Sequence, residues 1–454
     1  MQIIWAQQAL TAQGWRKDVA LSIDADGKIA RVDSGVAPTG YRTGILLPAP
    51  ANVHSHAFQR AMAGMTERRG PDPRDTFWTW RKLMFRFLDR LTPDDVEAIA
   101  AFVQMEMLEA GYAANVEFHY LHHQPGGASY ANPAEMACRI AAAAEQTGIG
   151  LTLLPVLYQH GGCDGRPLGP GQVRFGNSIE AFAKLLEMSG RAIAQLPADT
   201  VLGVAPHSLR AVTRESLAVA ATLLPSSPMH MHVAEQVAEI EEVLAAWGER
   251  PMAWLMANHC VDSRWCLIHC THMQPRETSA LAKSGAVAGL CPITESSLGD
   301  GIFDGKAFLE QAGRFGIGSD SNIRIALSEE LRTLEYSQRL RDRSRAVLAT
   351  PEFSTGRILF ECAAAGGAQA AGRNAGKIAP GCLADLVGLD SSAIELCGKS
   401  GDEVLDSYIF AGDDAMVHDV WSAGRHVVHH GRHRAHEAIT ARYRATITAL
   451  GREI

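Results

Sequence analysis

The sequence predicts an α/β protein built around a (β/α)8 barrel, with a smaller β-domain formed by both ends of the chain. Short apolar strands alternate with amphipathic helices through the middle of the chain, and short strands of similar texture recur at both ends. Alternating strands and helices imply parallel strands, and about eight such strands imply a closed barrel. An open doubly wound sheet is the alternative, but no GxGxxG or phosphate-binding loop supports it.

The distribution of the expected strands and helices divides the chain into three parts. We expect a first β-part at 1–48, the barrel at 49–376, and a second β-part with a C-terminal helix at 377–454. Each β-part is too short to enclose a core, so pairing of the two ends is the economical solution. The expected strands of these parts are 3–6, 19–23, 29–32, 384–389, 417–421 and 424–428, and the terminal helix is 436–450.

Within the barrel region, helix signals separate buried apolar runs. Thr92, Pro93 and the acids that follow predict the start of a helix that runs to Gly111. Asn132 and Pro133 begin another, and helical patterns follow at 213–224 and 236–246. After the strand that carries residues 54–56, the expected barrel strands are 151–157, 201–205, 229–233, 265–269, 287–291 and 314–318.

The composition limits which binding partners and which cellular compartment we expect. The net charge is −8, and no basic stripe with interleaved aromatic residues indicates nucleic acid. No apolar run reaches the roughly 18 residues of a membrane span, and no signal peptide stands at the start, so we expect a cytoplasmic protein. The nine cysteines are odd in number and form no CxxC pair, which indicates reduced thiols.

The residues that end the strands carry the chemistry. His54 and His56 stand two apart, so their imidazoles share one face of a strand. Later strands end at His232, His269 and Asp320, and barrel active sites lie at this edge. Three imidazoles and one carboxylate with a position left for water form a catalytic divalent site that suits zinc, which lowers the pKa of water from about 16 towards 7. Taken alone, His269 also fits a core histidine and Asp320 a helix cap.

These motifs resemble the amidohydrolase superfamily, in its mononuclear deaminase branch. The resemblance rests on His54-Ser55-His56, His232 with Glu235, His269, Ser319-Asp320 and the stretch 377–387, and it covers nearly the whole chain. It implies a distorted barrel and a β-sandwich built from both chain ends. It also implies one zinc ion per subunit, because no lysine stands at a bridging position. The implied ligands are His54, His56, His232 and Asp320.

Longer blocks are similar to the members of this branch that hydrolyse N-formimino-L-glutamate to N-formyl-L-glutamate and ammonia in histidine degradation. These blocks are residues 54–64, 77–81, 117–120, 207–212 and 298–303. The resemblance implies a homodimer and a dicarboxylate substrate, and arginine binds carboxylates in a bidentate manner. The residues implied to hold the two carboxylates are Gln59, Arg81, Tyr120, His207 and Arg210, with Glu235 and His269 also touching the substrate.

Three residues are assigned catalytic roles. We expect Asp320 to take the proton of the attacking water with help from His269, and Glu235 to protonate the leaving nitrogen. Each proton transfer contributes a factor of about 10²–10⁴ to the reaction rate. His269 could instead stabilise the tetrahedral intermediate by hydrogen bonding, and the sequence does not divide these roles.

Two other functions stay open at this stage. One is another zinc amidohydrolase that acts on an amidine or a nucleobase-like heterocycle; the segment 292–295 differs from the Asn-containing motif of guanine deaminases, which argues against that substrate. The other is a noncatalytic barrel that serves as an assembly protein. The remaining histidines are interpreted as loop residues near the pocket mouth (His119, His122 and His123) and as a solvated turn and helix start (His429, His430, His433 and His436).

Overall fold

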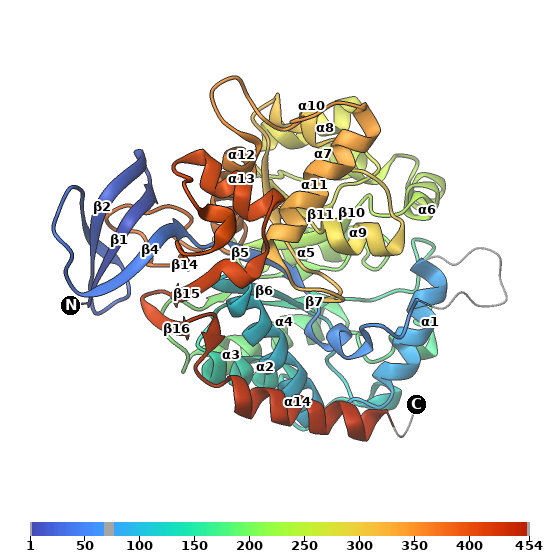
Figure 1. Cartoon of the computed structure of the whole chain (residues 1–454). Helices are drawn as coiled ribbons and strands as arrows, with labels where there is room; N and C mark the ends of the chain where they lie inside the picture. The colour runs from blue at the N-terminus through green and yellow to red at the C-terminus, as the bar shows by residue number, and fades with distance from the viewer. Residues whose placement is uncertain (1, 68–76, 452–454) are drawn as a thin grey trace.

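A ring of parallel strands forms the centre of the computed structural model, which describes residues 2–67 and 77–451. Figure 1 shows the ring surrounded by helices, with the strands of the chain ends at one side. One sheet has the order β5-β6-β7-β8 with β9 on β7, and a second has the order β10-β11-β12-β13. The strands are β5 (Ala51–Ser55), β6 (Ala114–His119), β7 (Gly150–Leu157), β8 (Val201–Leu202), β9 (Ala205–Pro206), β10 (Met229–Val233), β11 (Trp265–His269), β12 (Val287–Leu290) and β13 (Arg314–Ile317).

Two isolated parallel bridges join these sheets into a barrel. Val204 pairs with Met229 on one side, and Ser55 pairs with Asp320 on the other. Because each junction is a single bridge rather than a full ladder, the barrel is distorted. The predicted barrel is confirmed.

Helices cover the outside of the ring. Thr92 caps α2 (Pro93–Glu109) with the expected geometry, since its hydroxyl accepts from the Asp95 N–H while the Asp95 carboxylate accepts from the Thr92 N–H. The helices between and after the barrel strands are α1 (Phe77–Leu88), α3 (Glu135–Thr147), α4 (Ile179–Ile193), α5 (Arg214–Leu223), α6 (Val237–Trp247), α7 (Pro251–Asn258), α8 (Pro275–Ser284), α9 (Pro292–Leu298), α10 (Gly305–Leu309), α11 (Leu327–Asp342), α12 (Thr355–Ala370), α13 (Asp402–Phe410) and α14 (His436–Leu450). None of the described helices has the length and apolar character needed to cross a membrane.

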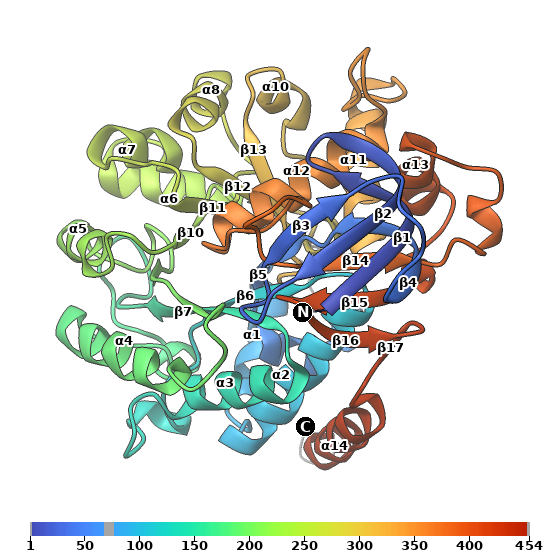
Figure 2. The ribbon, with the colours of Figure 1, turned by 90° about the vertical axis from the view of Figure 1, so that its left-hand side faces the viewer.

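Both chain ends contribute to one small β-sandwich, as predicted. Its strand order is β17-β16-β15-β14-β4-β1-β2-β3, so the N-terminal and C-terminal strands meet where β4 pairs antiparallel with β14 (Figure 2). Ile4, Leu21, Leu46 and Trp421 belong to its own buried cluster. The strands are β1 (Gln2–Thr11), β2 (Gly14–Ile23), β3 (Ile29–Asp33), β4 (Tyr41–Pro48), β14 (Leu386–Leu389), β15 (Val417–Ser422), β16 (Arg425–His429) and β17 (Arg432–His433).

Two details of the barrel differ from the prediction. The strand expected at 201–205 is divided into β8 and β9 around Gly203, where a side chain would lie 2.7 Å from the Pro228 carbonyl oxygen. β6 was not predicted as a strand, because Asn115 and Glu117 interrupt its apolar pattern although all its residues are buried. The domain boundaries after residues 48 and 376 stay predictions.

A buried ion-pair network connects the sandwich to the barrel. The Arg373 guanidinium lies 3.0 Å from Asp385, next to β14, and 3.0 Å from Asp199, next to β8. Arg425 of β16 pairs with the same Asp199 at 2.7 Å. The Arg373 side chain is 1% exposed, so removal of its charge would leave buried carboxylates without their partner.

We therefore expect Arg373→Ala to lower the free energy of unfolding by about 3–5 kcal/mol, the usual cost of breaking a buried pair. Arg191→Ala is the matched control, because its ion pair with Glu187 on α4 is exposed and exposed pairs contribute about 0–1 kcal/mol. Urea denaturation of both variants measures the difference. Equal midpoints would show that the network does not hold the two domains together.

Candidate active site

The candidate site lies where the last barrel strand meets the first. The Asp320 N–H donates to the His54 carbonyl at 2.9 Å, and the His56 N–H donates to the Asp320 carbonyl at 3.0 Å. Asp320 and His269 both have a left-handed backbone, with φ of 48° and 72°. Non-glycine residues in this conformation concentrate at functional sites, where the surrounding structure holds the strained backbone in place.

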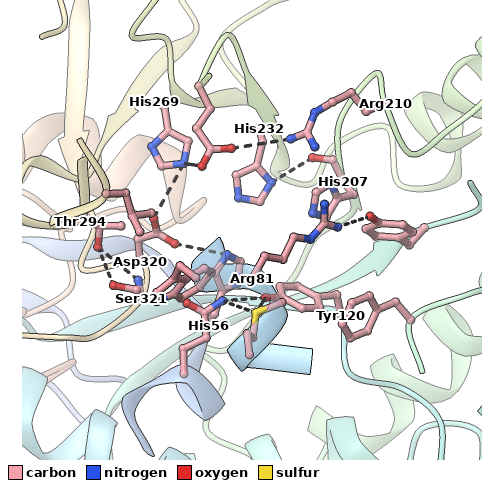
Figure 3. A pocket seen from close by; sticks show the side chains of 17 residues that line it. His56, Arg81, Tyr120, His207, Arg210, His232, His269, Thr294, Asp320 and Ser321 are labelled. Atoms are coloured by element: carbon pink, nitrogen blue, oxygen red, sulfur yellow. Dashed lines mark hydrogen bonds and ion pairs between the residues drawn. The ribbon is translucent and has the colours of Figure 1, made fainter. Parts of the chain in front are cut away.

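Three imidazoles and one carboxylate converge at this point, and Figure 3 shows His56, His232 and Asp320 of this group. The Nε2 atoms of His54 and His232 are 3.0 Å apart, and Asp320 Oδ1 lies 3.3 Å from His56 Nε2 and 3.6 Å from His54 Nε2. The potential ligand nitrogens of the three histidines all lie within 4.8 Å of one another. The four residues expected to bind a metal are therefore brought together.

The Nδ1 atoms of His56 and His232, which point away from the cluster, make hydrogen bonds that explain why a cation fits between the Nε2 atoms. His56 Nδ1 donates to the Phe118 carbonyl at 3.0 Å, and His232 Nδ1 donates to the His207 carbonyl at 3.0 Å. Their Nε2 atoms are therefore the nitrogens left to bind an ion: that of His56 lies 3.3 Å from Asp320 Oδ1, and that of His232 lies 3.0 Å from His54 Nε2. Several acceptors turned towards one point, each oriented by a hydrogen bond behind it, form the usual surroundings of a metal ion.

The protonation states agree with this arrangement. Burial lowers the pKa of His56 to about 3 and also lowers the pKa values of His54 and His232, so the three rings are neutral, as metal ligation requires. Burial raises the pKa of Asp320 to about 7 among protein groups alone. A cation beside it would favour the carboxylate form. The residues thus fit a divalent ion that imidazole and carboxylate prefer, such as zinc.

His269 lies among three carboxylates next to this cluster. Its Nε2 atom lies 3.9 Å from Glu235 Oε1 and 3.8 Å from Asp320 Oδ2, and its Nδ1 atom is 3.2 Å from Glu295. Burial alone would lower the pKa of His269, but these carboxylates raise it to about 10. Glu295 was not predicted as a site residue, although it lies in the segment 292–295 noted as unusual.

The residues expected to hold a substrate surround one pocket together with the cluster (Figure 3). Gln59 donates to the Tyr120 hydroxyl at 2.7 Å, and Arg81 donates to the Tyr158 hydroxyl at 2.7 Å. The Arg210 guanidinium lies 3.7 Å from Glu235 Oε2. The pocket is lined by the predicted residues His56, Gln59, Arg81, Tyr120, His207, Arg210, His232, Glu235, His269 and Asp320, and by Trp80, Met84, Tyr158, Phe175, Thr294, Leu298 and Ser321, which were not predicted.

The prediction of loop residues is wrong for His119, whereas His122 and His123 do lie in the loop after β6. His119 ends β6, and all three rings are buried. His122 Nε2 is 3.0 Å from the Val156 carbonyl and His123 Nε2 is 2.8 Å from the Gly176 carbonyl. None of the three lines the pocket.

A parallel barrel with a histidine–aspartate cluster at the carboxyl ends of its strands defines a metal-assisted hydrolase. The chain belongs to the amidohydrolase family, whose model matches residues 45–427. Residues 1–41 match a second model, described as the N-terminal domain of the formimidoylglutamate deiminase HutF. The resemblance inferred from the motifs is confirmed, and the chain is a hydrolase that acts on C–N bonds.

Individual relatives agree with the family. The chain is 49% identical to a formimidoylglutamate deiminase from Pseudomonas aeruginosa, over 99% of both chains. It is 28% identical to an 8-oxoguanine deaminase of the same organism, over 89% of this chain and 87% of the relative. A crystal structure of an amidohydrolase from Brucella melitensis superposes with a TM-score of 0.94 at 47% identity, covering 99% of this chain and 100% of that one.

A more distant structure shows the fold alone. An adenosine deaminase from Xanthomonas campestris, described with bound zinc, superposes with a TM-score of 0.82 at 21% identity, covering 100% of this chain and 99% of that one. The barrel and sandwich are thus shared well beyond the relatives that are close in sequence.

The geometry predicts that His232→Ala releases the metal ion, because it removes one of the converging nitrogens. His230→Gln is the control, since His230 lies on the same strand but its Nε2 atom is 2.8 Å from the Ala370 carbonyl, away from the cluster. Metal analysis of the purified variants should find about one equivalent in the control and far less in His232→Ala. Equal metal contents would contradict the assigned cluster.

Proposed function

We propose that this protein hydrolyses N-formimino-L-glutamate to N-formyl-L-glutamate and ammonia, with one zinc ion per subunit held by His54, His56, His232 and Asp320. The observation that carries the proposal is the presence of two arginines, Arg81 and Arg210, in the same pocket as the histidine–aspartate cluster. A dicarboxylate that bears an amidine needs both features. The 49% identity to a formimidoylglutamate deiminase supports the same activity.

Substrate binding uses the polar wall of the pocket. The two guanidinium groups bind the carboxylates, and the Tyr120 hydroxyl, the Gln59 amide and the His207 ring supply further hydrogen bonds. Tyr158 holds Arg81 in place through the 2.7 Å hydrogen bond, which lowers the entropy lost when the guanidinium binds a carboxylate. The amidine then points towards Glu235, His269 and Asp320.

Hydrolysis adds water to the formimino carbon and breaks its bond to the terminal nitrogen. A divalent ion held by His54, His56, His232 and Asp320 would lower the pKa of water and so make hydroxide available at neutral pH. Asp320 accepts the proton of the water, and His269, 3.8 Å from Asp320 and 3.9 Å from Glu235, stands between the two carboxylates. Glu235 protonates the departing nitrogen, so that ammonia leaves instead of an amide anion. His269 also donates a hydrogen bond to the tetrahedral intermediate.

The other two candidate functions have less support. An uncharged heterocycle would have no carboxylate to bind to the two guanidinium groups, Arg81 and Arg210, that line the pocket. A noncatalytic barrel would have no need for neutral imidazoles turned towards one point.

A cytoplasmic location and a homodimer are also part of the proposal, because the chain resembles the superfamily. Light scattering of the purified protein tests the dimer.

The direct test is an assay of ammonia release from N-formimino-L-glutamate by the metal-loaded protein. We expect turnover that stops when a chelator removes the ion and returns when zinc is added, because water activation depends on the ion. Absence of ammonia release by the metal-loaded protein would contradict the proposed substrate.

The two arginines give a second prediction. Arg81→Ala and Arg210→Ala should each raise KM for N-formimino-L-glutamate by about 10–100-fold, since a charge-assisted hydrogen bond contributes about 1.5–3 kcal/mol. With N-formiminoglycine, which has a single carboxylate, one of the two substitutions should raise KM far less, because the arginine that it removes has no carboxylate of that substrate to bind. Arg214→Ala is the control, because Arg214 packs over Trp247 and Trp254 outside the pocket. Equal effects on both substrates would argue against two carboxylate sites.

A further inference from the structure

A second group of histidines lies on the β-sandwich, around the buried carboxylate of Asp419. Asp419 is in β15, and its side chain is 0% exposed. The histidines beside it are His418 of β15, His426 and His429 of β16, and His430 just after β16. None of these residues lines the active-site pocket. Figure 2 shows β15 and β16 in the half of the sheet that the C-terminal part of the chain contributes.

Hydrogen bonds to Asp419 orient two of the rings. Its Oδ1 atom accepts from the Tyr41 hydroxyl at 2.7 Å and from His426 Nε2 at 2.8 Å, while its Oδ2 atom accepts from His418 Nδ1 at 2.9 Å. Burial raises the pKa of Asp419, but hydrogen bonds from His426, His418 and Tyr41 lower it below its usual value. The group is therefore an ionised carboxylate that stands behind two imidazoles.

The tautomer of His418 follows from this contact. Because Nδ1 donates to the carboxylate, Nε2 is the ring nitrogen left to bind an ion. That atom faces His430 Nδ1 at 2.8 Å, which is similar to the 3.0 Å between the His54 and His232 nitrogens in the active site. A carboxylate that accepts the other ring N–H is the common arrangement behind a metal-binding histidine.

The hairpin fixes the position of the second ring. The Gly431 N–H donates to the His418 carbonyl at 2.8 Å, and His430 has a left-handed backbone with φ of 50°. β16 pairs with β17 through Val428 and His433 and through His429 and Arg432. His430 is exposed, so an ion could reach the pair from solvent without rearrangement of the backbone.

We propose that His418 Nε2 and His430 Nδ1 bind a divalent transition-metal ion of the class that prefers imidazole, such as Zn²⁺ or Ni²⁺, separate from the active-site ion. Asp419 serves as the carboxylate behind His418, and water completes the coordination. The rings of His426 and His429 are tilted by 38° with 3.5 Å between their centroids, and their nitrogens lie within 4.8 Å of an Asp419 oxygen. The bound ion joins β15 to the segment after β16 and so stabilises this edge of the sandwich.

Metal counting after equilibrium dialysis tests the site in the full-length protein without a histidine tag. After dialysis against micromolar Zn²⁺, the wild type should hold one more equivalent than His418→Gln/His430→Asn, with unchanged hydrolase activity. His430→Asn alone should lose the same equivalent, and this exposed position tolerates asparagine because asparagine adopts left-handed backbone readily. His259→Gln on the barrel surface should bind as the wild type does.

The outcomes are distinguishable. Loss of the extra equivalent in both His430 variants but not in His259→Gln supports the site, as does a rise of Tm with added Zn²⁺ that only these variants lack, because an ion that binds the folded state raises its stability. Equal zinc contents in the wild type and the variants would overturn the proposal and leave the 2.8 Å contact as a plain hydrogen bond. Saturation only at millimolar zinc would overturn it as well.

Discussion

The backbone hydrogen bonds that close the barrel also build the active site. Asp320 exchanges two of them with the first strand, through the His54 carbonyl and the His56 N–H. The close approach needs Gly318, since a Cβ there would lie 2.8 Å from the Cβ of His54. Closure of the ring and convergence of the cluster are therefore the same event, and a chain that failed to close would not assemble the site.

Neighbouring strands then set the chemistry of each ring. Carbonyl groups of Phe118 in β6 and His207 after β9 accept the Nδ1 protons of His56 and His232. The order of strands in the barrel thus decides which nitrogen of each imidazole is free. On the other side of the pocket, Tyr158 and Glu235 contact the two arginines, so these contacts orient both guanidinium groups.

The sequence alone was sufficient to predict the parts of the fold and of the candidate site that depend on local residue patterns. The strand-end positions of His54, His56, His232, His269 and Asp320 follow from the alternation of strands and helices, and the structure brings all of them together. The terminal helix was predicted with its observed limits, and the capping residue of α2 was identified. These features depend on a few adjacent residues, which a single sequence shows directly.

Other features depend on partners far apart in the chain. β6 was missed because Asn115 and Glu117 are buried polar residues, and Glu117 is satisfied by the Ala57 N–H at 2.7 Å. Glu295 contacts His269 from α9, and Tyr158 contacts Arg81 across 77 residues. No local pattern marks such pairs, so only the fold shows them. His119 was placed in a loop for the same reason, because it belongs to the missed strand β6.

The most direct test of the account is a crystal structure of the zinc-loaded protein with anomalous scattering measured at the zinc absorption edge. The account predicts an anomalous peak at the barrel mouth, about 2.0–2.2 Å from nitrogen atoms of His54, His56 and His232 and from a carboxylate oxygen of Asp320. A metal-loaded crystal without a peak between these four side chains would contradict it.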